Sequence, residues 1–194
     1  MTCLRNTNIA LTLKAAPFAL RAEKASDAVA RETLLDACFG ENRHARTCQR
    51  LRDGRTSAEG LAFSAIADGN LVGTVRLWHV SAGGTRALML GPLAVDRTSR
   101  KLGVGTALMD HALAAATARG PRAVILLGDG PYYARFGFSA ERTAAMSLPG
   151  PFERERLLGL ELQAGALDGA CGMIVPTGAA AANPAQKAPR ARAA

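Results

Sequence analysis

The chain has few aromatic residues, no clustered cysteines and no long apolar run. Aromatic residues make up 5% of the 194 residues, so a core has to be built mainly from Leu, Val, Ile and Ala. The cysteines form no CxxC pair and no Cys/His spacing of a zinc finger, which indicates reduced thiols and predicts no metal site. These cysteines are Cys3, Cys38, Cys48 and Cys171.

No segment of the sequence has the composition of a membrane anchor or a leader. The apolar runs are far shorter than the roughly 20 residues that a membrane-crossing helix requires. The start, Met1 to Phe18, lacks a continuous apolar region and a clear cleavage site, so we predict no signal peptide. We therefore expect a cytoplasmic protein with no membrane partner.

The net charge of +8 attracts anions, but it is concentrated at the two ends. The last 18 residues carry three basic residues and no acid, and the first 16 carry two basic residues and no acid. Only +3 of the +8 therefore remains for the body, where the basic residues are scattered and not banded along one helix with interleaved aromatic residues. This pattern does not favour nucleic acid as a partner, although binding through the basic ends remains an alternative.

The sequence predicts one domain between two tails. Residues 1–17 show no period and are expected to form a loose N-terminal arm. The patterned region runs over residues 18–176, which is long enough to bury a core of its own. Residues 177–194 are rich in Ala, Pro, Gly, Lys and Arg and are predicted to be a disordered basic tail.

The first half of the patterned region predicts a short strand, a helix and then a polar segment. The strand covers residues 18–22, and Ser26 with Asp27 is typical of a helix start. Residues 40–60 are polar and charged and are expected to form a loop or a mobile helix. The helix has an apolar stripe at helical spacing: Val29, Leu34, Leu35 and Cys38.

The clearest β signal follows as an antiparallel meander. Strands over residues 61–67 and 71–78 are separated by Asp68-Gly69-Asn70, and both Asp and Gly tolerate the positive φ of a tight hairpin. A turn at residues 81–84 leads to a third strand over residues 86–95. Proline cannot donate to a β ladder, so Gly91-Pro92 predicts a break in that third strand.

The second half changes to alternating helix and strand. Residues 103–119 have one apolar helical face, and residues 123–127 form a fully apolar strand, which together predict a parallel crossover. We expect a mixed α/β fold whose central sheet has six to seven strands, antiparallel first, with one parallel crossover and helices on its faces. The remaining elements are a short helix over residues 132–136 and strands over 143–147, 157–162 and 173–175.

A potential anion site lies where the third strand gives way to the helix. Gly103 and Gly105 permit close approach of a ligand to the backbone, and Arg100 and Lys101 add positive charge beside free amides of the helix start. The Rossmann fingerprint fails because its third glycine would fall on Leu108, and the Gly-Lys-Ser/Thr of a Walker loop is absent. The segment meets the Arg/Gln-x-x-Gly-x-Gly/Ala pattern of a pyrophosphate loop in full.

Two stretches of the sequence resemble the GNAT superfamily of N-acetyltransferases. Leu93-Ala94-Val95 followed by Arg100-Lys101-Leu102-Gly103-Val104-Gly105 is similar to its central motif. The segment from Leu126 to Phe138, with later pieces at residues 148–152 and 160–162, resembles the YhbS-like branch. The resemblance covers roughly residues 18–175. Arg97 stands where many members have proline, and Lys101 where many have glycine.

The resemblance implies that acetyl-CoA is the cosubstrate, and no cluster of ligand residues in the sequence supports a metal. The pantetheine arm of acetyl-CoA would pair with the broken strand, and a backbone N–H near Leu93 would polarise the acetyl carbonyl. A neutral primary amine would attack the thioester directly in a ternary complex. The cofactor-binding residues implied are Leu93, Ala94, Val95, Arg100, Lys101, Leu102, Gly103, Val104, Gly105 and Thr106.

The same resemblance assigns Tyr133 as the catalytic acid that protonates the departing thiolate. Tyr133 lies four residues before Gly137, and a phenol with a reference pKa of about 10 is protonated at neutral pH. Tyr132 is the alternative acid, and packing of Tyr133 without proton transfer remains the other interpretation. Phe136 and Phe138 are expected to be core residues.

A general base is not apparent from the sequence, because the strand over residues 86–95 contains no carboxylate. His79 is one candidate, against a surface or packing role. His111 is expected on the surface. The polar segment offers three residues that would either be solvated or line the acceptor site: Glu41, Arg43 and His44.

The sequence thus predicts an acetyl-CoA-dependent N-acetyltransferase that acts on a small-molecule or peptide amine. A non-catalytic acyl-CoA-binding regulatory protein on the same fold is the alternative, since no base is found. Antibiotics, polyamines, amino acids and protein N-termini all stay open as acceptors. A homodimer is expected only by analogy with relatives.

Overall fold

The computed structural model describes residues 17–181 as three α-helices, nine strands and six short 3-10 helices. The helices are α1 (Ala28–Phe39), α2 (Val104–Thr117) and α3 (Gly130–Ala134). The strands are β1 (Ala19–Ala22), β2 (Ala62–Ala67), β3 (Asn70–Ala82), β4 (Thr85–Val95), β5 (Ala123–Leu127), β6 (Met146–Ser147), β7 (Leu157–Glu161), β8 (Gly172–Met173) and β9 (Val175–Pro176). The 3-10 helices are η1 (Ala25–Asp27), η2 (Glu41–Ala45), η3 (Thr47–Leu51), η4 (Arg97–Ser99), η5 (Glu141–Thr143) and η6 (Arg154–Arg156).

Seven of these strands form one mixed sheet in the order β1-β2-β3-β4-β5-β7, with β9 beside β3. Within the described chain, the β4–β5 pair is parallel and every other pair in this sheet is antiparallel. The predicted fold class, an antiparallel meander followed by one parallel crossover, is confirmed. Strands β6 and β8 form a separate parallel pair.

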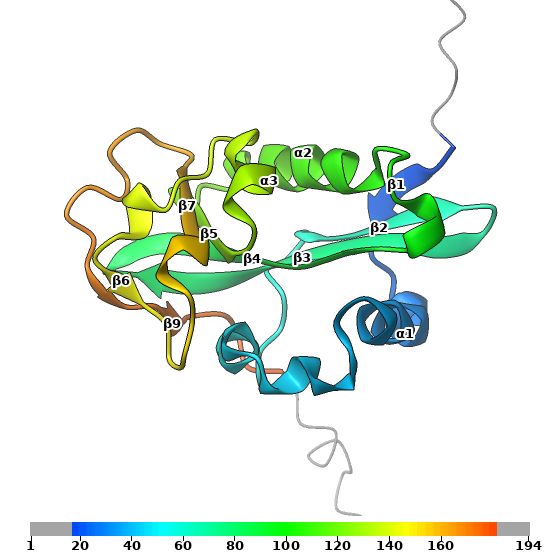
Figure 1. The fold of residues 1–194 in the computed structure, drawn as a ribbon, viewed down its shortest axis with the longest axis horizontal. Helices are drawn as coiled ribbons and strands as arrows, with labels where there is room; N and C mark the ends of the chain where they lie inside the picture. The colour runs from blue at the N-terminus through cyan, green and yellow to red at the C-terminus, as the bar shows by residue number, and fades with distance from the viewer. Residues whose placement is uncertain (1–16, 182–194) are drawn as a thin grey trace, which may run out of the picture.

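Helices cover the sheet on both faces (Figure 1). Helices α2 and α3 lie on one face, while α1 and the 3-10 helices η2 and η3 lie on the other. The segment predicted as a loop or a mobile helix, residues 40–60, thus contains two short 3-10 helices below the middle of the sheet. None of the helices in residues 17–181 has the length and apolar character that crossing a membrane demands.

The first hairpin has the tight turn that its sequence predicts. Asp68 and Gly69 have φ values of 47° and 78°, and Ala67 pairs with Asn70 across the turn. Two successive residues with positive φ match the right-handed twist of the flanking strands, which favours this turn over the common types.

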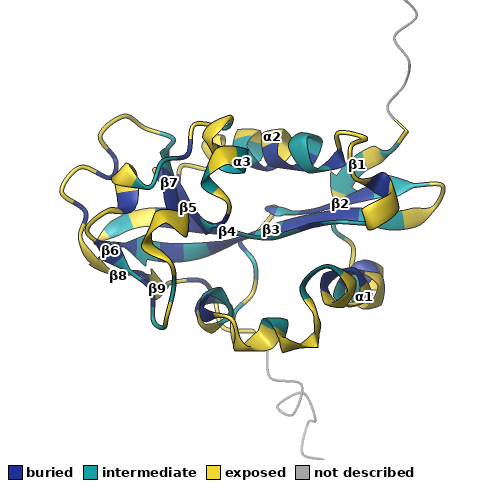
Figure 2. Cartoon of the chain, viewed as in Figure 1, coloured by how far each residue is buried: buried dark blue, intermediate teal, exposed yellow. Residues whose placement is uncertain are grey.

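The central strands are largely buried between the helices (Figure 2). The alternation of side chains along these strands divides the core in two. Leu88 on β4 and Val124 on β5 face α2, whereas Met89 and Ile125, one residue further along each strand, face the opposite side. Both faces of β5 are therefore buried, which explains its uninterrupted apolar sequence. Gly73 on β3 permits the close approach of α2, since a Cβ there would lie 2.8 Å from Cγ1 of Val104.

Strands β4 and β5 pair only over Ala87–Met89, so the edge of β4 that faces β5 is unpaired from Leu90 onward. The predicted break at Gly91-Pro92 coincides with a register shift in the β3–β4 ladder, between Val75 and Leu77 on β3. The indole N–H of Trp78 donates to the Gly91 carbonyl oxygen at 2.7 Å. The sheet is therefore split at its centre, and the break is held by a buried side chain of the neighbouring strand.

Two local expectations differ from the structure. Val29, assigned to the apolar stripe of α1, is 80% exposed, because only Leu34 and Leu35 of that stripe are buried against the sheet. The strand expected over residues 143–147 is reduced to Met146–Ser147 and is preceded by a 3-10 helix.

The ends of the chain differ from the predicted boundaries in one respect. Residues 177–181, assigned to the disordered tail, form hydrogen bonds with the domain. The Thr56 N–H donates to the Ala179 carbonyl oxygen, and the Ala181 N–H donates to the Gly54 carbonyl oxygen. The rest of the predicted tail, residues 182–194, and residues 1–16 of the predicted arm lie outside the described residues.

Candidate active site

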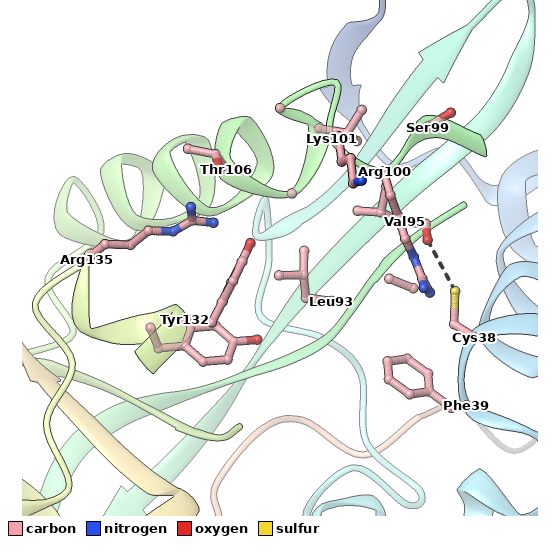
Figure 3. Close-up of a pocket in the computed structure, with 15 residues that line it drawn as sticks. Cys38, Phe39, Leu93, Val95, Ser99, Arg100, Lys101, Thr106, Tyr132 and Arg135 are labelled. Carbon is pink, nitrogen blue, oxygen red and sulfur yellow. Dashed lines mark hydrogen bonds between the residues drawn. The ribbon is translucent and has the colours of Figure 1, made fainter. Parts of the chain in front are cut away.

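A cavity of about 540 Å³ opens where β4 separates from β5 (Figure 3). Its wall is formed by the end of β4, the loop after it, the start of α2 and helix α3. Leu102 alone among the predicted cofactor-binding residues does not line it, and its side chain is 51% exposed. The other nine are brought together there: Leu93, Ala94, Val95, Arg100, Lys101, Gly103, Val104, Gly105 and Thr106.

The loop and helix start present a row of free backbone donors to this cavity. Within residues 17–181, no backbone or side-chain oxygen accepts a hydrogen bond from the N–H groups of Arg100, Lys101 or residues 103–106. The first ladder bond of α2 runs from Ala107 to the Gly103 carbonyl oxygen at 2.9 Å. Free amides at a helix start favour an anion through both hydrogen bonding and the helix dipole.

The loop has internal hydrogen bonds that leave those donors free. A carboxylate oxygen of Asp96 accepts bonds from the Thr98 hydroxyl at 2.5 Å and from the Thr98 N–H at 2.9 Å. These bonds hold the pKa of Asp96 below its usual value, so Asp96 is ionised at neutral pH.

Two residues of the loop occupy the left-handed region of backbone conformation. They are Lys101, with φ of 73°, and Gly103, with φ of 82°. A glycine adopts this conformation freely, whereas a side chain there costs roughly 1–2 kcal/mol. The lysine at position 101 therefore carries a backbone strain that glycine would relieve, and it adds a charge beside the free amides.

The hydroxyl of Tyr132 lies against the start of α2. A Cβ at Gly105 would be 3.0 Å from the Tyr132 hydroxyl oxygen and 3.6 Å from Cγ2 of Val95. A side chain at position 105 would therefore press on the Tyr132 hydroxyl, and glycine permits α3 to approach α2 this closely. The ring of Tyr132 is stacked under the guanidinium of Arg135, whose Cζ lies 4.2 Å from the ring centroid.

Tyr133 is half-buried and packs more deeply than Tyr132. Its ring makes edge contacts with Tyr132 and with Phe138, at centroid distances of 4.8 and 5.9 Å. Burial, with smaller contributions from Tyr132 and Asp129, raises the pKa of Tyr133 to about 12. Tyr133 is therefore a neutral phenol, able to donate a proton, across the physiological pH range.

A second cavity, of about 650 Å³, adjoins the first. The two cavities share Phe39, Leu93 and Tyr133, so the predicted acid and the predicted carbonyl-polarising strand lie at their junction. Two carboxylates line this second cavity: Asp129 and Glu153.

The candidate base His79 and most of the polar-segment residues considered for the acceptor site lie outside both cavities. Of the polar-segment candidates, only Arg43 lines the second cavity, and Glu41, His44 and His79 line neither. His79 is beside Gly178 instead, with a Cβ there 3.8 Å from the Cβ of His79. His111 is exposed on α2, as expected.

The expected core roles of the two phenylalanines near α3 are confirmed. Phe138 is buried in the core, and Phe136 is half-buried against the same core. No group of three or more His, Cys, Asp or Glu residues in the described chain is placed to hold a metal ion.

Comparison with known proteins identifies the family. The model of the Acetyltransferase (GNAT) family matches residues 29–138, which is more than half of the chain and includes the loop, α2 and α3. The chain belongs to the GNAT acetyltransferase family. The family predicted from the sequence is confirmed. No curated protein matches the chain.

Solved GNAT structures share this fold. The *Escherichia coli* YhbS N-acetyltransferase, solved with CoA, is 28% identical over 84% of this chain and 92% of its own, with a TM-score of 0.72. A *Brucella melitensis* GNAT acetyltransferase, solved with acetyl-CoA, is 25% identical over 88% of this chain and 98% of its own, with a TM-score of 0.56. A *Staphylococcus aureus* GNAT acetyltransferase at 17% identity and a TM-score of 0.51 shares the fold alone, over 75% of this chain and 99% of its own.

The candidate site also contains residues that the sequence did not assign to it. Cys38 and Phe39 at the end of α1 reach the first cavity from the opposite face of the sheet, and the Cys38 thiol lies 3.5 Å from the Val95 carbonyl oxygen. No local pattern could have placed them, because the contact spans 57 residues. The sequence could have indicated Arg135 as a site residue, because Arg135 follows Tyr132 by three residues and so shares its helical face.

Proposed function

We propose that this protein transfers an acetyl group from acetyl-CoA to a primary amine by direct attack in a ternary complex. The observation that carries the proposal is the junction of the two cavities at Leu93 and Tyr133. One cavity offers free backbone donors for a diphosphate, and the other offers separate space for an amine. The family membership and the CoA and acetyl-CoA ligands of two similar GNAT structures support the same assignment.

The first cavity fits the parts of acetyl-CoA. The free N–H groups of residues 103–106, with Arg100 and Lys101, match the charge and the acceptor oxygens of a diphosphate. The unpaired edge of β4 from Leu90 to Val95 offers backbone groups to the amides of a pantetheine arm, as an added strand would use them. No side chain at position 105 covers the helix start, and the Tyr132 hydroxyl lies 3.0 Å from where a Cβ of Gly105 would be.

In the proposed reaction, the lone pair of the neutral amine forms a bond to the thioester carbonyl carbon, and the carbon–sulfur bond breaks. Tyr133 donates its phenolic proton to the departing thiolate, the proton lost by the amine passes to solvent, and solvent then reprotonates the Tyr133 phenolate. The raised pKa keeps Tyr133 protonated for this step. A backbone N–H near Leu93 stabilises the negative charge that develops on the carbonyl oxygen.

Two measurements on the purified full chain test the proposal. Calorimetry with acetyl-CoA should show saturable binding, and release of free thiol should depend on an added primary amine. Saturable binding without thiol release across a broad amine panel would instead favour a regulatory acyl-CoA-binding protein. Absence of acetyl-CoA binding would contradict both the proposed acetyltransferase and the regulatory alternative. A cytoplasmic location and a homodimer remain predictions from the sequence.

A further inference from the structure

The second cavity is lined by more positive than negative charge. Its charged residues include two carboxylates, Asp129 and Glu153. Its cations are four arginines: Arg43, Arg46, Arg52 and Arg156. An amine acceptor that is itself cationic would be repelled by such a surface, so the excess of arginine calls for an explanation.

Two of the four arginines already have carboxylate partners in the protein. Arg43 makes ion pairs with Glu32 at 2.5 Å and with Asp36 at 2.6 Å. Arg156 lies 3.6 Å from Glu153 in an exposed pair. Their charges are therefore at least partly neutralised and do not by themselves demand a ligand.

Arg52 is different, because it is half-buried and has no carboxylate partner among residues 17–181. Its Nε donates to the Cys48 carbonyl oxygen at 3.1 Å, and this is the hydrogen bond that the fold provides for its guanidinium. Burial lowers the pKa of Arg52, and the neighbouring Asp53, which forms no ion pair with it, opposes that shift only in part. Burial also raises the pKa of the Cys48 thiol, so Cys48 is neutral and does not offset the charge. A partly desolvated cation without an ion pair is costly to keep.

Arg46, whose side chain is exposed, is a second cation without an ion pair on the same wall. Its Nη2 donates to the Phe39 carbonyl oxygen at 3.2 Å, and its guanidinium lies 5.2 Å from the Phe39 ring centroid. No carboxylate of the described chain forms an ion pair with Arg46. Because Phe39 lines both cavities, this charge stands near the junction where the proposed reaction occurs.

We propose that the acceptor is an amine that also carries an oxyanion, a carboxylate or a phosphate, which Arg52 and Arg46 bind in the second cavity. A guanidinium matches the planar, two-oxygen face of either group. This inference rests on the proposed acetyl transfer and narrows its acceptor. Among the acceptors left open by the sequence, it favours amino acids and acidic peptides over polyamines and cationic antibiotics.

Matched pairs of acceptors test the inference on the full chain. Thiol release would be measured for an amino acid and its carboxamide, for phosphoethanolamine and ethanolamine, and for spermidine. The anionic member of a pair should have the higher kcat/KM, by about tenfold or more, since hydrogen bonds to charged groups are the strong ones. The pair with the larger ratio identifies the carboxylate or the phosphate as the anion.

Arginine variants then assign the effect to this cavity. Arg52→Gln should lower kcat/KM for the anionic member about tenfold to a hundredfold, mainly through KM, and leave the neutral member unchanged. Arg46→Gln changes an exposed side chain and provides a second variant with a smaller loss in the same direction. Arg122→Gln removes the same charge from an exposed residue just before β5, outside both cavities, and should change neither member. Acetyl-CoA affinity and thermal unfolding show whether each variant is folded.

Several outcomes would overturn the inference. They are equal kcat/KM within every pair, an equal loss for both members in folded Arg52→Gln and Arg46→Gln, or acetyl-CoA binding with no transfer to any anionic amine. Transfer to neutral amines alone would remove only the inference and leave acetyl transfer intact. Failure of the wild-type chain to bind acetyl-CoA would remove the proposed function and the inference together.

Discussion

Tyr133 rests directly on the backbone of Gly128. A Cβ at position 128 would lie 2.3 Å from Cε2 and 2.8 Å from Cδ2 of the Tyr133 ring, distances at which the ring has to move. Gly128 follows the last residue of β5, so the strand itself sets the height of the ring above the split sheet. The proposed acid is thus positioned by a rigid element and by the absence of one methyl group.

Replacing Gly128 by alanine should therefore lower turnover while acetyl-CoA binding is largely kept. Displacement of the Tyr133 ring by even about 1 Å can cost on the order of a hundredfold in rate, because proton transfer depends on distance. The measurement is kcat for thiol release alongside the dissociation constant of acetyl-CoA.

Gly130→Ala is the matched control for this change. Gly130 is two residues along the chain, where an added Cβ would meet no atom within 4 Å. The control should therefore keep wild-type kcat. Equal kcat in Gly128→Ala and wild type would show that the ring position is unimportant.

Removing the Tyr133 hydroxyl should separate binding from chemistry. Tyr133→Phe is expected to lower kcat by about 10²–10⁴-fold, the range of a general acid, with acetyl-CoA affinity nearly unchanged. Tyr132→Phe removes the neighbouring hydroxyl, which lies at the start of α2, and should have the smaller effect on kcat. If Tyr132→Phe shows the larger loss, the acid is Tyr132 and the assignment of Tyr133 is wrong.

The pH dependence of kcat provides an independent check on Tyr133. Because the pKa of Tyr133 is raised from 10.0 to about 12, its phenol stays protonated through pH 10. The wild-type rate should therefore rise with pH as the acceptor amine loses its proton, without a falling limb from Tyr133. A falling limb below pH 10 that disappears in Tyr133→Phe would contradict this. The raised pKa also contributes stability that is present below pH 10 and lost as the pH rises towards 12.

Two glycines with the same backbone conformation distinguish strain from ligand binding. Gly103 in the loop and Gly120 beyond α2 have φ of 82° and 85°, and an added Cβ meets no protein atom within 4 Å at either position. Valine at either site should cost roughly 1–2 kcal/mol or more of folding stability through its positive φ. Only Gly103→Val should also weaken acetyl-CoA binding in calorimetry, because only Gly103 lines the first cavity. Equal acetyl-CoA affinity in the two variants would exclude the loop from the site.

Removing the Trp78 indole N–H should lower both the stability of the fold and the affinity for acetyl-CoA. Trp78→Phe removes the N–H that bonds the Gly91 carbonyl at the break in β4. Loss of a partner for this carbonyl should cost about 1–3 kcal/mol in chemical unfolding, and a loosened β4 should bind acetyl-CoA more weakly. Unchanged stability together with unchanged affinity would mean that the break is held by other contacts.

The sequence was most informative where one local rule dominated. Asp68-Gly69 determined a hairpin, Gly91-Pro92 located the break in β4, and the fully apolar run of β5 indicated burial on both faces. Gly103 and Gly105 located the loop because free amides and missing side chains are properties of the local chain.

The sequence was least informative where distant segments meet. The stripe of α1 wrongly included Val29, because helical spacing alone does not say how wide a face the sheet will cover. Cys38 and Phe39 reach the site only because α1 ends beside β4. No local sequence pattern identifies Arg52, because its lack of an ion-pair partner depends on how the folded chain forms the cavity.

A crystal structure of the chain with CoA bound is the most direct test of the central claim, that the backbone around residues 100–106 holds a diphosphate. We expect diphosphate oxygens at about 2.7–3.2 Å from the N–H nitrogens of residues 103–106, with the pantetheine arm along the open edge of β4. A diphosphate bound elsewhere, with those N–H groups still facing solvent, would contradict the account.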